Sequence, residues 1–390
     1  GWCSGLFPVS DARLAREHGR DAARTMRRTL QAAVDEIGRV ALAEKIDCAF
    51  AKGGSIVAAR NAAQVTTARA EVAEAHALGL DHDDLRWMDG AEAGEVVDIA
   101  GMRGATFTPH CASLDPARLV RGLADAVERR GVSVFERTPA LDVRPGGPGR
   151  RPVVRSAGGT VTADVVVVAL EAWSESLAAR RRRIVPVYSL MLATEPLDDA
   201  VWAEIGLANR ETFADGRRLV IYGQRTADGR IAFGGRGAPY HFASTTRDRF
   251  DTDPRIHEGL RETLVELFPA LRGVEITHRW GGPIGVPRDW WPSVGLDRSS
   301  GVAWAGGYVG DGVAASNLAG RTLADLILGR DTELVGLPWV GHRGPKWERE
   351  PLRWMGINAV LWATNLGDRT ERRHGRPSRV ASAADRLLGG

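Results

Sequence analysis

A glycine-dense segment between Ala303 and Gly329, AWAGGYVGDGVAASNLAGRTLADLILG, constrains the fold more than any other part of this chain. It predicts a short apolar strand that turns into an amphipathic helix packed on a sheet, with a repeating apolar face of Ala319, Leu323, Leu326 and Ile327. The turn glycines let the backbone approach a flat or anionic ligand, and the helix start offers unpaired N–H groups. These glycines are Gly306, Gly307, Gly310 and Gly312. We interpret the segment as a cofactor cradle; the alternative is a tight turn that needs glycine only for packing.

The beginning of the chain lacks the usual signature of a dinucleotide-binding unit. Such a unit normally opens with a strand, the pattern G-x-G-x-x-G, a helix and an acidic residue about 20 positions later. No segment before Asp115 pairs a buried strand with that pattern, and the chain opens at Gly1, not at methionine. We therefore expect the natural protein to be longer, and we expect a chain that truly starts at Gly1 to bind a dinucleotide poorly.

Composition sets outer limits on function. The 390 residues are enough for two globular domains, and a formal net charge of +3 gives no reason to expect a nucleic-acid partner. Apolar runs such as 165–170 are far shorter than the roughly 20 residues of a membrane span. Cys3, Cys48 and Cys111 are odd in number and lack metal-ligand spacing, so we expect no disulfide framework, no metal site and a cytoplasmic location. Nothing in the sequence indicates the oligomeric state.

Secondary-structure signals alternate along the chain and change in character after Arg180. Periodicity and capping residues predict helices at 10–49, 60–76, 116–131 and 253–268. Runs rich in β-branched residues predict strands at 53–60, 132–136, 160–170, 184–193, 219–223 and 231–235. The last three are separated by turn signals, which indicates an antiparallel sheet.

Five motifs, in order, resemble FAD-dependent oxidoreductases of the D-amino-acid oxidase and glycine oxidase superfamily. They are GWCSG at 1–5, LDPARL at 114–119, GVSVFERTPALDV at 131–143, VVVVALEAW at 165–173 and GGYVGDGVAASNLAGRTLADLI at 306–327. The likeness is greatest to the amine-oxidising branch that includes gamma-glutamylputrescine oxidoreductase. It implies an α/β (α+β) fold with an N-terminally truncated, Rossmann-like FAD-binding domain and an interleaved antiparallel substrate domain. The first comprises 1–50, 101–180 and 286–335, the second 51–100 and 181–285, and a helical extension with a basic tail occupies 336–390.

The resemblance also implies which positions contact FAD. They are Gly1, Trp2, Cys3, Ser4, Thr138, Ala140, Ala169, Trp173, Gly307, Tyr308, Gly310, Asp311, Gly312 and Val313. The last six belong to the cradle, where the helix start carries a partial positive charge of about half a unit facing the flavin pyrimidine. Three positions depart from the family pattern: Ala140 stands where valine is usual, and Leu170 and Glu171 replace small or polar residues.

The activity implied is hydride transfer from a C–N bond of a small amine or amino acid to the flavin, followed by hydrolysis of the imine. Amino-acid oxidases of this superfamily use an arginine soon after a W-x-G turn to bind the substrate α-carboxylate. The corresponding stretch 280–285, WGGPIG, has no arginine, so we favour an amine without that carboxylate. Arg236, Tyr240 and His241 are the candidate catalytic or substrate-binding residues, although surface or interdomain hydrogen bonding explains them equally well.

Two other functions remain open. One is an FAD dehydrogenase that passes electrons to an acceptor other than oxygen. The other is a non-catalytic, flavin-free scaffold, which the missing glycine fingerprint favours and the retained glycine cradle disfavours.

Overall fold

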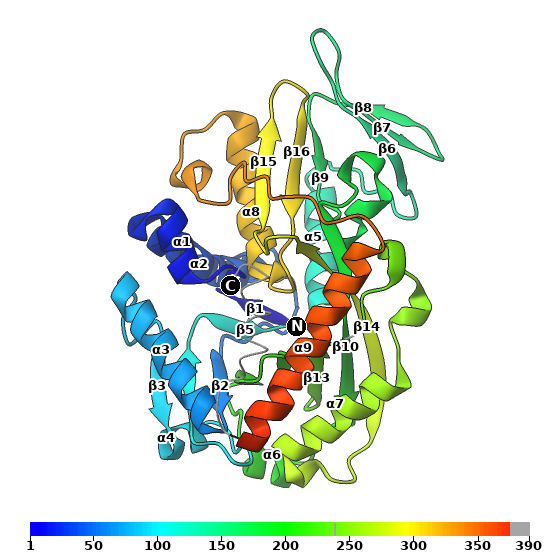
Figure 1. Cartoon of the computed structure of the whole chain (residues 1–390). Coiled ribbons are helices and arrows are strands. Elements are labelled where there is room, and N and C mark those ends of the chain that lie inside the picture. The colour runs from blue at the N-terminus through cyan, green and yellow to red at the C-terminus, as the bar shows by residue number, and fades with distance from the viewer. Residues whose placement is uncertain (238, 375–390) are drawn as a thin grey trace.

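The computed structural model describes residues 1–237 and 239–374, in which helices and strands interleave around two principal sheets (Figure 1). An eight-stranded sheet fills the lower half of that view. A three-stranded sheet lies above it, beside helix α8 (Gly312–Leu328). The predicted α/β (α+β) class is confirmed, whereas the predicted domain boundaries stay a prediction.

The large sheet has the strand order β14-β10-β13-β12-β11-β2-β4-β3. Its strands are β2 (Ser55–Ala59), β3 (Arg86–Asp89), β4 (Gly104–Thr108), β10 (Ile184–Thr194), β11 (Thr212–Asp215), β12 (Ile221–Arg225), β13 (Ile231–Arg236) and β14 (Ile276–Pro287). β11 runs parallel to β2, with Phe213 opposite Ile56, and the other neighbours are antiparallel. The antiparallel sheet predicted after Arg180 is confirmed, although the strand predicted at 219–223 begins only at Ile221.

Helix α7 (Pro254–Leu267) covers one face of this sheet. It begins where the sequence predicts, because Asp253 accepts hydrogen bonds from the N–H groups of Arg255 and Ile256. Its buried residues recur every three or four positions and pack into the sheet core: His257, Leu260, Leu264 and Leu267.

The helix predicted at 10–49 is two helices, α1 (Asp11–His18) and α2 (Arg20–Ala43), divided at Gly19 with φ +88°. α2 packs on α8 through buried residues that include Leu30 and Val34. Leu42, near the end of α2, is nevertheless 83% exposed. The reason is geometric: successive helical residues are rotated by about 100°, and the buried Ala41 already faces the core.

Two predicted strands differ in the structure. Residues 132–136 form no strand, because no neighbouring strand in the described part of the chain pairs with them, and Phe135 is 76% exposed. The strand predicted at 160–170 is split, since its ends find partners in different sheets. β8 (Thr160–Thr162) pairs with β7 (Val153–Ser156), which also pairs with β6 (Ala140–Arg144). β9 (Val166–Val168) runs parallel to β16 (Val302–Gly306), whose other neighbour is β15 (Ser293–Asp297).

The N-terminal strand β1 (Trp2–Ser4) pairs antiparallel with β5 (Cys111–Ser113). Helix α5 (Pro116–Glu128) then begins at the predicted position, with the Asp115 side chain accepting two backbone N–H groups. The remaining helices are α3 (Ala62–Leu78), α4 (Gly90–Gly94) and α6 (Asp199–Ile205).

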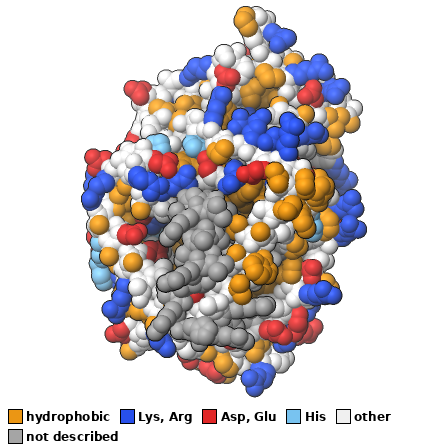
Figure 2. All heavy atoms as spheres, viewed as in Figure 1, with side chains coloured by type: hydrophobic (Ala, Val, Ile, Leu, Met, Phe, Trp, Pro, Cys, Tyr) orange, Lys and Arg blue, Asp and Glu red, His pale blue; other side chains and the backbone are white. Residues whose placement is uncertain are grey.

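Helix α9 (Leu352–His374) crosses the front of the molecule in Figure 1. Its Asp368 accepts hydrogen bonds of 2.9 Å from the N–H groups of Arg218 and Leu219. Hydrophobic side chains gather on the same face in Figure 2, and α9 contributes Leu352, Trp354, Met355, Trp362 and Leu366 to the exposed ones. Across the described ranges, no helix combines the length and the apolar content needed to cross a bilayer. The basic tail predicted beyond residue 374 lies outside the described residues.

Candidate active site

The predicted cradle lies between the end of β16 and the start of α8. Gly306 and Gly307 have φ of +154° and +81°, a conformation that side chains disfavour. A Cβ atom at Gly307 would stand 2.5 Å from Cγ of Pro287, so the turn also has no room for one. The first turn of α8 begins without a side-chain cap, since Asp311 makes no capping hydrogen bond.

A carboxylate accepts hydrogen bonds from the backbone N–H groups of this cradle. Glu171 Oε2 accepts the N–H of Gly307 at 2.5 Å, and Oε1 accepts the N–H of Tyr308 at 3.0 Å. Glu171 itself has φ +45°, which aims its side chain from the end of β9 across to β16. In the sequence, Glu171 stands out only as a departure from the family pattern. That departure was the available signal, and the structure places its carboxylate at the centre of the cradle.

Burial dominates the electrostatics of this carboxylate. Burial raises the pKa of Glu171 and outweighs the backbone N–H groups of Gly307, Tyr308 and Gly285, which act in the opposite direction. The pKa of the neighbouring Tyr308 hydroxyl is also raised, first by burial and then by the charge of Glu171. Main-chain N–H groups thus hold the Glu171 carboxylate at a position with little access to water.

The N-terminal residues of the predicted flavin site do reach α8. Ser4 Oγ donates to Asp311 Oδ1 at 3.2 Å, which joins two predicted positions separated by 307 residues of sequence. Trp2 makes an edge contact with Tyr222, with ring centroids 6.0 Å apart, and Gly1 accepts the N–H of Leu114 through its carbonyl oxygen. These contacts bring the two ends of the predicted site together.

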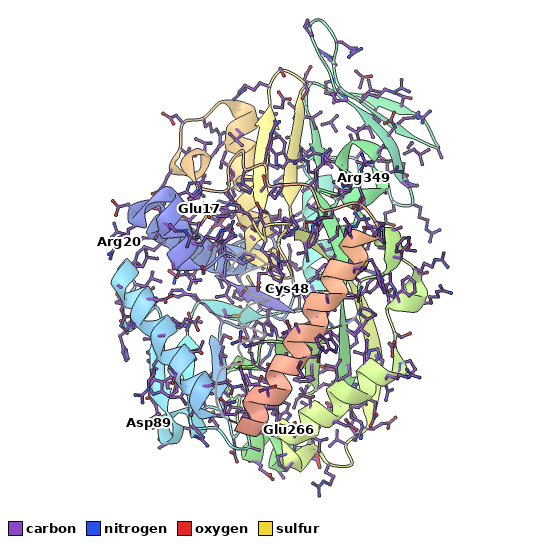
Figure 3. The ribbon with its side chains drawn as sticks, viewed as in Figure 1. Glu17, Arg20, Cys48, Asp89, Glu266 and Arg349 are labelled. Atoms are coloured by element: carbon purple, nitrogen blue, oxygen red, sulfur yellow. The ribbon has the colours of Figure 1, made fainter. Side chains whose placement is uncertain are left out.

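Cys3 belongs to the core that contains α2 and α8. Its thiol is fully buried, and burial raises its pKa, which removes thiolate character. Cys48 and Cys111 are buried free thiols as well, and Cys48 lies near the middle of the molecule in Figure 3.

Four other predicted FAD positions are exposed or only partly buried. Thr138 and Ala169 are exposed, and the Trp173 side chain is 56% exposed. Ala140 opens β6 and packs against a small core that contains Val168. Ala169 directly follows β9, whose Val168 pairs with Trp304 of β16, and the role of these four residues stays a prediction.

Two of the three candidate catalytic residues, Tyr240 and His241, are engaged in structural contacts. The Tyr240 hydroxyl is buried and donates to Glu350 Oε1 at 2.9 Å, just before α9. His241 stacks on Phe250, with ring centroids 3.5 Å apart, and burial together with Arg249 lowers its pKa. Arg236 ends β13 opposite Ser189. None of these observations assigns a reacting atom to the three residues.

A cavity of about 380 Å³ begins at Gly306 and runs along the small sheet toward Asp297. Its walls come from β16, the turn after β9 and the segment 342–345. Within the described ranges, His, Cys, Asp and Glu side chains form no group of three suited to a metal ion.

Comparison with known proteins decides the family. The profile of the DAO family, described as FAD dependent oxidoreductase, matches residues 1–326. The chain belongs to this family. A solved structure of glycine oxidase from Geobacillus kaustophilus has a TM-score of 0.70 and 21% identity, with 88% of each chain covered, which shows the shared fold.

Two curated relatives indicate how much of a family member is present. The chain is 34% identical to the probable oxidoreductase OrdL of Rhizobium meliloti over 57% of this chain and 48% of that protein. It is 29% identical to gamma-glutamylputrescine oxidoreductase of Escherichia coli over 83% of this chain and 73% of that protein. The chain spans about half the length of OrdL.

FAD is the cofactor of the DAO family, and the donor set of the cradle fits it. The two N–H groups that converge on Glu171 suit the carbonyl and ring-nitrogen acceptors along the pyrimidine edge of a flavin. The same donors cannot serve Glu171 and a flavin at once. Binding at the cradle therefore requires the Glu171 side chain to move aside.

Proposed function

We propose that this chain is part of an FAD-dependent oxidoreductase that oxidises the C–N bond of a small amine. The observation that carries the proposal is the pair of convergent main-chain donors at Gly307 and Tyr308, directly before the uncapped start of α8. The names of the relatives support the substrate class, since gamma-glutamylputrescine oxidoreductase and a glycine oxidase of Geobacillus kaustophilus are both among them.

The cradle residues would contribute by orienting a bound flavin and by stabilising negative charge on it. A bound flavin would supply the hydride acceptor. The N–H groups of Gly307 and Tyr308 and the helix dipole of α8 stabilise negative charge at the cradle, and they need no reorganisation to do so. The raised pKa of Glu171 makes its neutral form more accessible, which lowers the cost of withdrawing it from these donors.

Substrate preference is inferred from β14. The strand carries Arg279 before Trp280, but none of its residues 280–287 is an arginine able to bind an α-carboxylate. Arg279 Nη1 already donates to the Ile276 carbonyl oxygen. We therefore retain an amine without an α-carboxylate as the proposed substrate. Oxygen is the proposed electron acceptor, with another acceptor as the alternative.

One observation favours a second candidate function, a flavin-free scaffold. Glu171 satisfies the cradle donors internally, as a carboxylate would in a protein that has no use for the cofactor. The two candidates differ in whether Glu171 is displaced.

Flavin titration of the full chain, followed by flavin fluorescence, tests the proposal. We expect FAD to bind and Glu171→Ala to tighten binding by about tenfold, because one competing charge-assisted acceptor is removed. Glu333→Ala, which removes an exposed carboxylate, is the matched control and is expected to leave binding unchanged. Failure of both the natural chain and Glu171→Ala to bind FAD would favour the scaffold.

If FAD binds, oxygen consumption with diamines and with glycine then tests the substrate class. A diamine is expected to react and glycine is not. Reduction of the flavin without oxygen consumption would instead support the dehydrogenase.

A further inference from the structure

Three arginines from distant parts of the chain meet on the wall of the 380 Å³ cavity. Arg180 and Arg183 follow β9, and Arg343 belongs to the segment that leads to α9. The Cζ atoms of Arg180 and Arg343 lie 5.6 and 5.3 Å from the ring centroid of Trp304. Arg183 Nη1 donates to the carbonyl oxygen of Gly344 at 2.9 Å, which holds the two segments together.

These three guanidinium groups have no carboxylate partner among residues 1–237 and 239–374. In the described part of the chain no Asp or Glu oxygen lies within 4.0 Å of any of them. Burial, and then the charges of Arg183 and Arg343, lower the pKa of Arg180. The tertiary structure thus gathers positive charge that no carboxylate of the described residues neutralises.

The acidic residues on the same cavity wall are committed to other partners. Asp289 Oδ2 accepts from His342 Nε2 at 2.8 Å, and Asp297 Oδ1 accepts from Ser299 Oγ at 2.7 Å. Asp142 pairs with Arg144 at 3.0 Å. Within the described residues, none of these carboxylates is paired with the arginine cluster, which leaves its charge available to an anionic ligand.

Trp304 gives the cluster a fixed platform. Its Nε1 donates to Ser293 Oγ at 2.8 Å, and Ser293 Oγ donates to the His342 carbonyl oxygen at 2.6 Å. A Cβ atom on Gly295 would lie 2.4 Å from Trp304 Cζ2, so the ring lies across β15 only because that position is glycine. The guanidinium groups are therefore placed against a rigid ring, which lowers the entropy lost on binding.

We propose that this cavity binds a diphosphate-bearing ligand, with Arg180, Arg183 and Arg343 holding the phosphate oxygens. A diphosphate matches a cluster of planar guanidinium donors in both charge and acceptor number. The cavity volume lies within the range of small-ligand sites. The ligand has two chemical sources, the diphosphate of FAD or a free nucleoside diphosphate. The first of these rests on the proposed function, and the second does not.

Calorimetric titration of the full chain with ADP, adenosine and inorganic pyrophosphate tests the inference without any flavin. We expect ADP and pyrophosphate to bind, and adenosine to bind at least about tenfold more weakly, because it has no phosphate. Arg180→Gln and Arg343→Gln are each expected to weaken ADP binding by about tenfold or more. Arg151→Gln is the matched control, since it removes the same charge from an exposed arginine paired with Asp164.

A second arm separates the two sources. Competition between ADP and FAD, together with weaker binding of FAD but not of riboflavin in Arg343→Gln, assigns the site to the cofactor. ADP that binds alongside FAD, or in a chain that binds no FAD, assigns it to a free nucleotide. The inference is overturned if neither ADP nor pyrophosphate binds, or if adenosine binds as tightly as ADP. It is also overturned if Arg151→Gln weakens ADP binding as much as Arg343→Gln does. Circular dichroism of each variant confirms that a loss of binding is not a loss of fold.

Discussion

Glu171 Oε2 accepts the backbone N–H of Gly307 at 2.5 Å across 136 residues of sequence. This contact joins the end of β9 to the end of β16 and fills the cradle from within the protein. It makes Glu171 the residue that controls access of any other acceptor to these donors.

The stability contributed by Glu171 should depend on pH. Its folded pKa is raised, mainly by burial, so its contribution is fully present below the unfolded pKa and is lost as the pH rises through the folded pKa. We expect the free energy of unfolding of the natural chain, minus that of Glu171→Gln, to fall as the pH rises above the ordinary pKa range of a glutamate, because glutamine does not titrate. Urea unfolding at each pH measures it; a difference that increases with pH would contradict the raised pKa.

Gly307→Ala should destabilise the cradle. The new Cβ would meet Pro287 at 2.5 Å in a backbone conformation with φ +81°, and we expect a loss of about 1–3 kcal/mol in the free energy of unfolding. Gly320→Ala is the control within α8, where nothing lies within 4 Å of the added Cβ, and it should gain about 0.5–1 kcal/mol. Equal effects in urea unfolding would show that the turn at Gly307 is not constrained.

Tyr240→Phe should loosen the attachment of α9. The hydroxyl donates to Glu350 and accepts from the N–H of Ser244, both at 2.9 Å, so its loss leaves buried groups unsatisfied and should cost about 1–3 kcal/mol. Tyr188→Phe loses only a 3.2 Å bond from the Arg247 N–H and should cost about 0.5–1.5 kcal/mol. Thermal unfolding gives both values, and faster tryptic cleavage near Arg353 in Tyr240→Phe alone would report the local loosening.

The three thiols should be inert in the folded protein. Burial raises the pKa of Cys111 to about 12 and also raises the pKa of Cys3 and Cys48. We expect Ellman's reagent to react with none of them in the native chain and with all three in urea. Rapid reaction of any thiol under native conditions would indicate an open path to the core around α2.

Local patterns predicted the helix starts well, because capping chemistry acts over a few residues. α5 and α7 begin within one residue of the predicted starts, where Asp115 and Asp253 cap them. Residues 132–136 were wrongly predicted as a strand, since a β-branched run becomes a strand only where a neighbour pairs with it. The glycine cradle was recognisable because few sequences place so many glycines at a strand-to-helix turn, but its present occupant was not predicted.

The sequence by itself determined the family, the elements flanking the cradle and the absence of an arginine at 280–287 of β14, because each is written in contiguous residues. Only the tertiary structure decided that Glu171 meets the amides of Gly307 and Tyr308, and that Arg343 joins Arg180 beside Trp304. Both contacts join residues more than a hundred positions apart. Such contacts depend on how strands and loops are placed in space, and no local periodicity encodes that placement.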